Sequence, residues 1–109
     1  MSYRILFTTE FEKELKKLSS KYPSLRYDFS VFLQELSINP IQGTSLGNQC
    51  YKIRFAIRSK GKGKSGGARV ISFVQIVKET VVLISIYDKS VKESISNEEI
   101  KERLKKYLN

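Results

Sequence analysis

The spacing of apolar residues changes near the middle of the chain, from a helical period to a strand-like one. Between Thr9 and Asn39 apolar side chains recur every three or four positions, whereas from Tyr51 to Arg58 apolar and basic residues alternate. The first spacing gathers apolar side chains on one stripe of a helix, and the second gathers them on one face of a strand. The chain is therefore restricted to folds that pack helices on a sheet, and 109 residues suit one domain spanning residues 1–109.

Two amphipathic helices are predicted in the first half of the chain. Thr9 and Glu12 have the spacing of a capping box, which opens the first helix. Pro23 breaks the pattern, because proline suits the first turn of a helix and not its interior. A second helix is predicted from about Ser24 until Asn39-Pro40 ends it. Two helices joined so closely should form an antiparallel hairpin.

Strands at both ends of this hairpin and a final helix complete the predicted fold. Alternation predicts strands at residues 1–8 and 51–58, the apolar segments 69–76 and 81–87 are predicted as two further strands, and residues 41–49 are predicted as a loop. Ser96 and Glu99 form another capping box, opening a helix that turns Ile100, Leu104 and Leu108 inward. The order β-α-α-β-β-β-α predicts an α+β fold: an antiparallel β-sheet with an N-terminal helical hairpin packed on one face, and a C-terminal helix. The opposite face is left for function.

A glycine-rich basic loop joins two of the predicted strands. Between Arg58 and Arg69 the chain has no acidic residue, and Lys60, Lys62 and Lys64 stand at alternate positions among glycines. Glycine lets the backbone take positive φ angles and approach a ligand closely, and lysine supplies charge for a phosphate. Folding alone does not require this combination, so the loop predicts contact with phosphate.

The charge of the chain points to a polyanionic partner. Twenty basic and eleven acidic residues leave a net charge of +9. A uniformly basic surface is one interpretation, but the cations cluster where acidic residues are scarce, which favours nucleic acid. The cluster consists of Lys52, Arg54, Arg58, Lys60, Lys62, Lys64, Arg69 and Lys78. Strand alternation sends Lys52, Arg54 and Arg58 to the face opposite the apolar one.

Several classes of site are excluded by the residues present. Gly63-Lys64-Ser65 matches the end of a nucleotide-binding P-loop, but Arg58 stands where that motif needs a glycine. The chain has no histidine, which removes imidazole acid–base pairs, Ser-His triads and histidine zinc sites. Four acidic residues lack the spacing of metal ligands and are predicted to be solvated: Asp28, Glu35, Asp88 and Glu93. Neither a metal nor a small-molecule cofactor is predicted.

The apolar segments are too short for a membrane protein. The longest are far below the roughly 20 residues that span a bilayer, and the N-terminal residues lack the apolar core and cleavage site of a signal peptide. We therefore expect a cytoplasmic protein with no membrane partner. Cys50, the single cysteine, is expected to be a packed thiol.

Lysine, arginine and tyrosine remain for chemistry, and these side chains suffice to cleave RNA through its own 2′-hydroxyl. A lysine among other cations has a lowered pKa and suits proton transfer, while arginines stabilise the charge on the non-bridging phosphate oxygens. The candidates are Arg54, Arg58, Lys60, Lys62, Lys64, Arg69, Tyr87 and Lys89. A non-catalytic phosphate-binding surface made of the same residues is equally compatible with the sequence.

Three segments resemble a known family. They begin at Tyr51 (Tyr-Lys-Ile-Arg-Phe), at Gly63 (Gly-Lys-Ser-Gly-Gly-Ala-Arg-Val-Ile) and at Ile86 (Ile-Tyr-Asp-Lys-Ser). Together with the order of elements they resemble the RelE/ParE superfamily of type II toxin–antitoxin toxins, and most closely its HigB-like, RelE-type branch. The resemblance implies an endoribonuclease that enters the ribosomal A site, with contacts to 16S rRNA, and cuts the bound mRNA. It also implies a 2′,3′-cyclic phosphate product and a cognate antitoxin that covers the site.

The resemblance carries over to individual positions. Arg69 matches the arginine that opens the family's central strand and contacts the phosphate in the transition state, and Lys89 matches the basic residue after the last strand. Lys52 and Arg54 match the basic face of the second strand, and the loop that holds Lys60, Lys62 and Lys64 is longer than in many members. Several RelE-type enzymes have a tyrosine near the position of Ile95, where this chain has none. Either Tyr87 or a lysine would take its place, so the general base stays open.

Two other functions fit the same scaffold. ParE-like members poison DNA gyrase without enzymatic activity, and a non-catalytic RNA-binding module would use the same cations. The dense lysines of the loop favour contact with an RNA backbone. The preferred interpretation is therefore a ribosome-dependent mRNA endoribonuclease.

Overall fold

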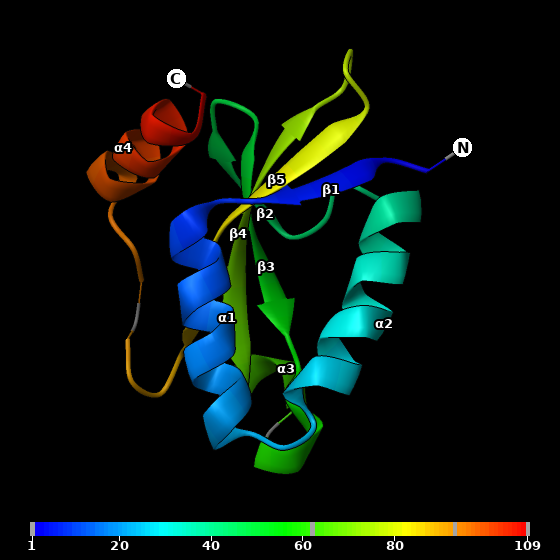
Figure 1. The fold of residues 1–109 in the computed structure, drawn as a ribbon, viewed down its shortest axis with the longest axis vertical. Coiled ribbons are helices and arrows are strands. Elements are labelled where there is room, and N and C mark those ends of the chain that lie inside the picture. The colour runs from blue at the N-terminus through cyan, green and yellow to red at the C-terminus, as the bar shows by residue number, and fades with distance from the viewer. Residues whose placement is uncertain (1, 62, 93, 109) are drawn as a thin grey trace.

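The chain has an α+β fold, in which a helical hairpin follows the first strand and the remaining strands come mostly in pairs. The computed structural model describes residues 2–61, 63–92 and 94–108, with the backbone alone for Lys64 and Ser65. The elements are β1 (Arg4–Phe7), α1 (Thr9–Lys21), α2 (Leu25–Ile38), β2 (Thr44–Gly47), β3 (Cys50–Phe55), the 3-10 helix η1 (Arg58–Lys60), α3 (Gly63–Gly66), β4 (Ala68–Gln75), β5 (Thr80–Asp88) and α4 (Asn97–Leu108) (Figure 1). This confirms the predicted fold class, with a helical hairpin and a C-terminal helix. No helix within the described ranges is both long and apolar enough to cross a bilayer.

The five strands form one sheet in the order β1-β5-β4-β3-β2. The pairs β3–β4 and β4–β5 are antiparallel, as predicted, and the edge pair β2–β3 is antiparallel too. The β1–β5 pair is parallel, so the prediction of a wholly antiparallel sheet is wrong at this edge. A parallel pair needs a long connection between its strands, and here nearly the whole chain, including the helical hairpin, lies between them. Alternation within a strand carries no information about the direction of its neighbour.

The segment predicted as a loop at residues 41–49 contains the edge strand β2. Its residues are mostly exposed, so it lacks the apolar alternation that marks a half-buried strand. The next strand is shorter than predicted: β3 ends at Phe55, and Arg58 belongs to η1. Strand parity therefore stops applying before Arg58.

The helical hairpin buries the main core against one face of the sheet. Phe11 is fully buried, stacks on Phe7 with ring centroids 5.5 Å apart, and lies 5.7 Å from the ring of Phe29. Thr8, and not Thr9, caps α1: its hydroxyl accepts a hydrogen bond from the Phe11 N–H at 3.1 Å and donates one to the Ile84 carbonyl at 3.1 Å. The capping residue also ties the helix to β5, so the start of α1 and the sheet are stabilised by one side chain.

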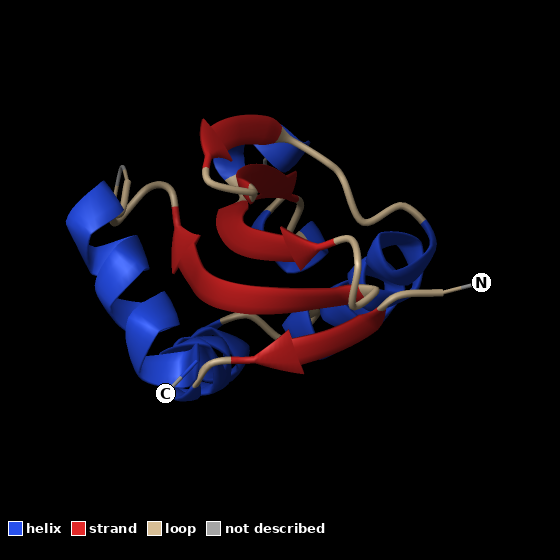
Figure 2. Cartoon of the chain, turned by 90° about the horizontal axis from the view of Figure 1, so that it is seen from above, coloured by secondary structure: helices blue, strands red, loops and turns tan. Residues whose placement is uncertain are grey.

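Helix α4 covers part of the opposite face. Figure 2 shows it along one flank of the twisted sheet, on the side away from the N-terminus. Arg103 holds it there, because its guanidinium contacts Glu14 of α1 at 3.0 Å, Glu99 at 2.6 Å and the Ile84 carbonyl at 3.1 Å. Ile100 is buried as predicted, but Leu108 is 54% exposed, so its predicted inward orientation is wrong. The face left for function is the part that α4 does not cover.

Candidate nucleic-acid interface

Two arginines and a tyrosine form a row across three neighbouring strands. Arg54 of β3 is the register partner of Arg69 of β4, and Arg69 is the partner of Tyr87 of β5. Like charges directly opposite one another in a sheet are destabilising. A sequence that places two arginines there indicates a site for an anion, because an anion between them removes the repulsion.

A cavity of about 570 Å³ is lined by the two arginines of this row. It brings together the cations Lys52, Arg54, Arg69 and Lys89. The remaining lining residues are polar or apolar: Gln42, Gly43, Thr44, Leu46 and Ile53. None of these described lining residues is acidic, so the cavity is positively charged and suits a phosphate. We call it the basic cavity.

Two glycines allow the backbone to build the basic cavity. Gly43 has φ +84°, and a Cβ on it would lie 2.2 Å from the carbonyl oxygen of Lys52. A Cβ on Gly67 would lie 2.3 Å from the carbonyl oxygen of Phe55, and the Gly67 carbonyl accepts a hydrogen bond from the Lys89 N–H at 3.1 Å. Any side chain at these positions would push the flanking strands apart. The loop glycine predicted to approach a ligand thus approaches β3 and fixes the position of Lys89.

Arg69 and Tyr87 are both buried, although they lie on the functional face. Each is 5% exposed, and one Arg69 Nη donates to the Ala68 carbonyl at 3.1 Å. The Tyr87 hydroxyl is buried without a hydrogen-bond partner in the described part of the chain, and Lys92 Nζ lies 5.9 Å from the centre of its ring. Burial raises the pKa of Tyr87 although the positive charge of Arg69 opposes the shift. The phenol is therefore protonated at neutral pH, and Tyr87 is the register partner of Arg69 on the adjacent strand.

Lys60 is held in a buried ion pair away from the basic cavity. Its Nζ lies 2.5 Å from Oδ1 of Asp88, and the two side chains are 9% and 2% exposed. Asp88 also accepts hydrogen bonds from the hydroxyl groups of Tyr22 and Ser90. Burial alone would raise the pKa of Asp88, but the hydrogen bonds from Lys60, Tyr22 and Ser90 together outweigh it and hold that pKa far below its ordinary value. A phosphate would have to displace Asp88 to reach Lys60.

The prediction that Asp88 and Asp28 are solvated charges is wrong. Asp88 is 4% exposed and Asp28 is 7% exposed. Asp28 accepts hydrogen bonds from the Arg58 N–H at 2.9 Å and the Ser24 hydroxyl at 2.7 Å. Both carboxylates fasten the basic loop to the helical hairpin, which is a role that residue spacing alone does not reveal.

Arg58 does not join the arginine row, which corrects the expectation from strand parity. Its guanidinium carbon lies 5.7 Å from the centre of the Tyr27 ring, beside α2. Arg58 and Arg54 line a neighbouring cavity of about 290 Å³ between α2 and β3. Two further predicted residues have no described side chain: Lys62 lies outside the described residues, and for Lys64 the structure describes the backbone in α3 and nothing of the side chain.

The sequence prediction missed the contribution of residues 42–46. Gln42, Gly43, Thr44 and Leu46 form one wall of the basic cavity, and their segment was predicted as a loop. The pair of glycines at 43 and 47 was the available signal, since both have positive φ.

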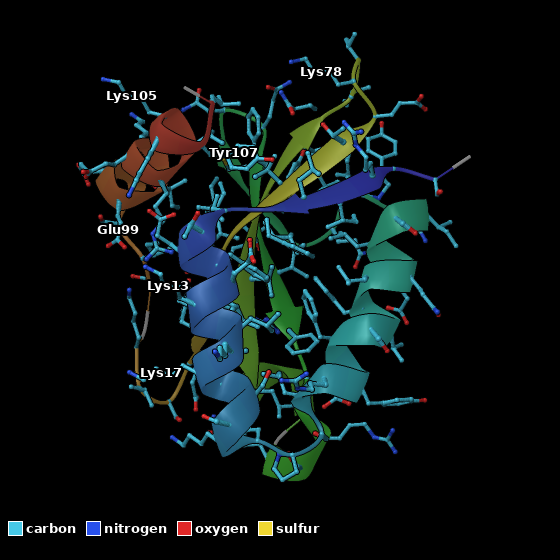
Figure 3. All side chains as sticks on the ribbon, in the orientation of Figure 1. Lys13, Lys17, Lys78, Glu99, Lys105 and Tyr107 are labelled. Atoms are coloured by element: carbon cyan, nitrogen blue, oxygen red, sulfur yellow. The ribbon has the colours of Figure 1, made fainter. Side chains whose placement is uncertain are left out.

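Basic side chains also lie elsewhere: Figure 3 shows Lys13 and Lys17 on the outer side of α1, and Lys105 on α4. They are matched controls for the cavity residues.

Known structures share this fold over nearly the whole chain. No protein-family model matches the sequence. The structure of a free double-arginine mutant of the Escherichia coli toxin RelE is 26% identical, with a TM-score of 0.63, and the match covers 97% of this chain and 98% of that one. The intact E. coli RelBE toxin–antitoxin complex matches at 26% identity and TM-score 0.61, over 80% of this chain and 96% of that one.

A more distant structure has the same fold. The RelBE2 toxin–antitoxin complex of Mycobacterium tuberculosis is 18% identical with a TM-score of 0.61, and the match covers 81% of this chain and 99% of that one. At this identity the similarity concerns the fold alone. Together with the matches to the E. coli toxin and the order of the elements, it shows that this chain has the RelE fold and is similar to RelE toxins of type II toxin–antitoxin systems.

Proposed function

We propose that this chain is a ribosome-dependent mRNA endoribonuclease, the toxin of a two-gene module. The observation that carries the proposal is the basic cavity, in which Lys52, Arg54, Arg69 and Lys89 meet on one sheet face. Four cations without an acidic neighbour in the described lining suit a polyphosphate backbone better than a small neutral substrate. The RelE fold provides the context, because the related E. coli structures are of a toxin.

The cavity supports cleavage by transesterification within the RNA. The 2′-oxygen of one nucleotide bonds to the adjacent phosphorus, the bond from phosphorus to the 5′-oxygen breaks, and a 2′,3′-cyclic phosphate and a 5′-hydroxyl result. One proton leaves the 2′-hydroxyl and one is delivered to the 5′-oxygen. Arg54 and Arg69, opposite each other in register, are placed to bind the non-bridging oxygens on which negative charge grows. This reaction needs neither imidazole nor metal.

We assign proton transfer to Lys89 and the support of Arg69 to Tyr87. Lys89 is exposed and lines the basic cavity, and its backbone is fixed by the hydrogen bond to Gly67. Tyr87 is buried and is not among the lining residues, and its raised pKa makes a phenolate base unfavourable. Lys52 and Lys64 remain the alternative proton-transfer groups, and Lys60 would join the RNA only after leaving Asp88.

We further propose that a cognate antitoxin covers the basic cavity. The similar structures from E. coli and M. tuberculosis include toxin–antitoxin complexes. An antitoxin that presents acidic side chains to Lys52, Arg54 and Lys89 would block the approach of RNA by charge neutralisation. Because the substrate is mRNA on the ribosome, the site of action is the cytoplasm.

Primer extension on mRNA in a purified translation system tests the proposal. The wild-type chain should cut the message at the ribosome, and Arg69→Ala should lower the rate about 100-fold, the usual effect of losing one transition-state donor. Because Arg69 is buried, the fold of this variant must be checked by circular dichroism. Arg69→Lys, which keeps the charge, should retain more activity, and Lys78→Ala at the distant β4–β5 turn should be unchanged (Figure 3).

Two outcomes would overturn the proposal. If the message stays intact after incubation with the folded wild-type chain, the non-catalytic RNA-binding module would be the remaining function. Inhibition of gyrase supercoiling in a parallel assay, without cleavage of mRNA, would instead favour the ParE-like function.

A further inference from the structure

A second cavity adjoins the basic one. It has a volume of about 290 Å³ and lies between α2 and β3. Gln42 and Arg54 line both cavities, so they form the boundary between them. A strand bound across Arg54 therefore passes directly from one cavity to the other. We call the second one the α2–β3 groove; its other residues used below are Tyr27, Phe32, Glu35 and Arg58.

The α2–β3 groove contains a stacking surface. The Tyr27 ring is 61% exposed, and the guanidinium carbon of Arg58 lies 5.7 Å from its centre. Asp28 fixes the backbone of Arg58 beside this ring, since it accepts a hydrogen bond from the Arg58 N–H at 2.9 Å. Aromatic rings and guanidinium planes are the surfaces on which unpaired nucleobases stack in RNA-binding proteins.

Charge decides which part of a nucleotide enters the groove. Asp28 and Glu35 line the groove together with Arg54 and Arg58, so their charges offset one another, and a phosphate is attracted less strongly there than to the basic cavity. The phosphates would stay on the side of Arg54, leaving the base to enter over the apolar ring of Phe32. The volume lies at the lower end of the range for ligand pockets, which suits a single base. The carboxylate of Glu35 accepts hydrogen bonds from exocyclic amino groups, as carboxylates do with bases.

We propose that the α2–β3 groove binds one nucleobase of the message, next to the nucleotide whose phosphate lies in the basic cavity. The inference rests on the proposed function and deepens it. Tyr27 and Arg58 stack on the base, and Glu35 favours a base with an exocyclic amino group (adenine, cytosine or guanine) over uracil. The groove therefore contributes sequence preference, whereas the basic cavity contributes the chemistry.

A double-mutant cycle between protein and message tests this subsite. Single-turnover cleavage is measured on ribosomes that carry messages with one abasic nucleotide at successive positions around the cleaved bond. The readout is the protein concentration that gives half the maximal rate. For the wild-type chain one abasic position should raise this concentration about tenfold, which corresponds to about 1.4 kcal/mol of stacking. Tyr27→Ala should raise it about tenfold on the intact message, and the same abasic position should then have no further effect.

Matched variants separate stacking on Tyr27 from a general loss of exposed aromatic surface. Tyr27→Phe keeps the ring and should behave as wild type, and Tyr107→Ala removes an exposed ring on the distant helix α4 (Figure 3) and should have no effect. Glu35→Gln should reduce the preference for amino-bearing bases over uracil at the abasic-sensitive position.

The outcomes distinguish this inference from the proposed function. If Arg69→Ala abolishes cleavage but no abasic position couples to Tyr27, the endoribonuclease stands and the base subsite is refuted. Weaker antitoxin binding by Tyr27→Ala with unchanged cleavage would assign the groove to a protein partner and also refute it. If the wild-type chain cuts no message, both the endoribonuclease activity and the base subsite are refuted.

Discussion

The two faces of the sheet use adjacent residues of the same strands for opposite purposes. On the helix-covered face Val70 and Leu83 are fully buried with Phe11, in an apolar cluster held by α1 and α2. On the other face Arg69, the neighbour of Val70 in β4, lies opposite Arg54 beside the basic cavity. Burial of apolar side chains on the first face stabilises the fold, whereas the repulsion between the two arginines on the second face destabilises it. The stability of one face thus permits the function of the other.

The largest effect is expected from a substitution in the helix-covered face. Phe11→Ala removes a fully buried ring in contact with Phe7 and Phe29, and should lower the free energy of unfolding by about 3–5 kcal/mol. Urea denaturation measures this change. Leu108→Ala, at a half-exposed site on α4, should change stability by less than about 0.5 kcal/mol. A loss below about 1 kcal/mol for Phe11→Ala would show that the two faces are not divided in this way.

Asp88 holds the basic loop through Lys60, and its removal should come next in size. Asp88→Asn leaves the buried Lys60 ammonium without its counter-charge, so we expect a loss of about 3 kcal/mol at neutral pH. The folded-state pKa of Asp88 is below the unfolded value of about 3.9. Its contribution is therefore complete above that value and is lost as the pH falls through the folded-state pKa.

Urea denaturation of both proteins at several pH values tests this. The difference in stability between wild type and Asp88→Asn should shrink as the pH is lowered from about 5 to about 2. Lys60→Met replaces the other partner and leaves a buried carboxylate that is easier to protonate, so this variant should also approach wild type in stability as the pH falls. A difference that is constant with pH would mean that Asp88 is not stabilised by its charge.

Activity should depend on the open face with little change in stability. Arg54→Gln removes one charged donor to the phosphate, an interaction of about 1.5–3 kcal/mol, and should slow mRNA cleavage about 10- to 100-fold. Arg54 is exposed, so thermal unfolding should change little. Lys13→Ala, which removes a cation from the outer side of α1, should cleave like wild type (Figure 3). Equal losses in both variants would mean that net charge, and not the basic cavity, governs activity.

The smallest effect concerns the junction of helix and sheet. Thr8→Ala removes both the cap of α1 and the hydrogen bond to Ile84, and should cost about 1–2 kcal/mol. Thr9→Ala, at the position that the capping-box pattern favoured, should change stability by about 0.5 kcal/mol or less. Thermal or urea denaturation of the two variants compares them directly. A larger effect at Thr9 would reverse the assignment of the cap.

Much of the fold could be predicted because its signals are local. Helical spacing marked α1, α2 and α4, alternation marked β3, and apolar β-branched segments marked β4 and β5, each within a few residues of its observed ends. The edge strand β2 was missed because exposed strands lack alternation, and the direction of β1 was missed because pairing is decided by distant residues. The family resemblance, which rested on short segments, is confirmed by the similarity to E. coli RelE over nearly the full chain.

The candidate site could be predicted only in part. Strand parity placed Lys52 and Arg54 on one face, and the structure brings them together with Arg69 and Lys89 in one cavity. The same reasoning grouped Arg58 with them, and the basic loop pattern added Lys60, but the structure directs these two residues to Tyr27 and Asp88. Their roles in catalysis or RNA binding stay predictions until the variants above are measured.

The sequence by itself determined the order of the elements, the apolar faces and the excess of positive charge, because periodicity and composition act over a few neighbouring residues. The tertiary structure decided which cations face a substrate and which are neutralised inside the protein. Lys60 and Lys89 are both lysines that follow a strand of the sheet, Lys60 in η1 and Lys89 directly after β5, yet one is buried against Asp88 and the other lines the basic cavity. The reason is that an ion pair depends on residues brought together in space, and Lys60 and Asp88 are 28 positions apart in the chain.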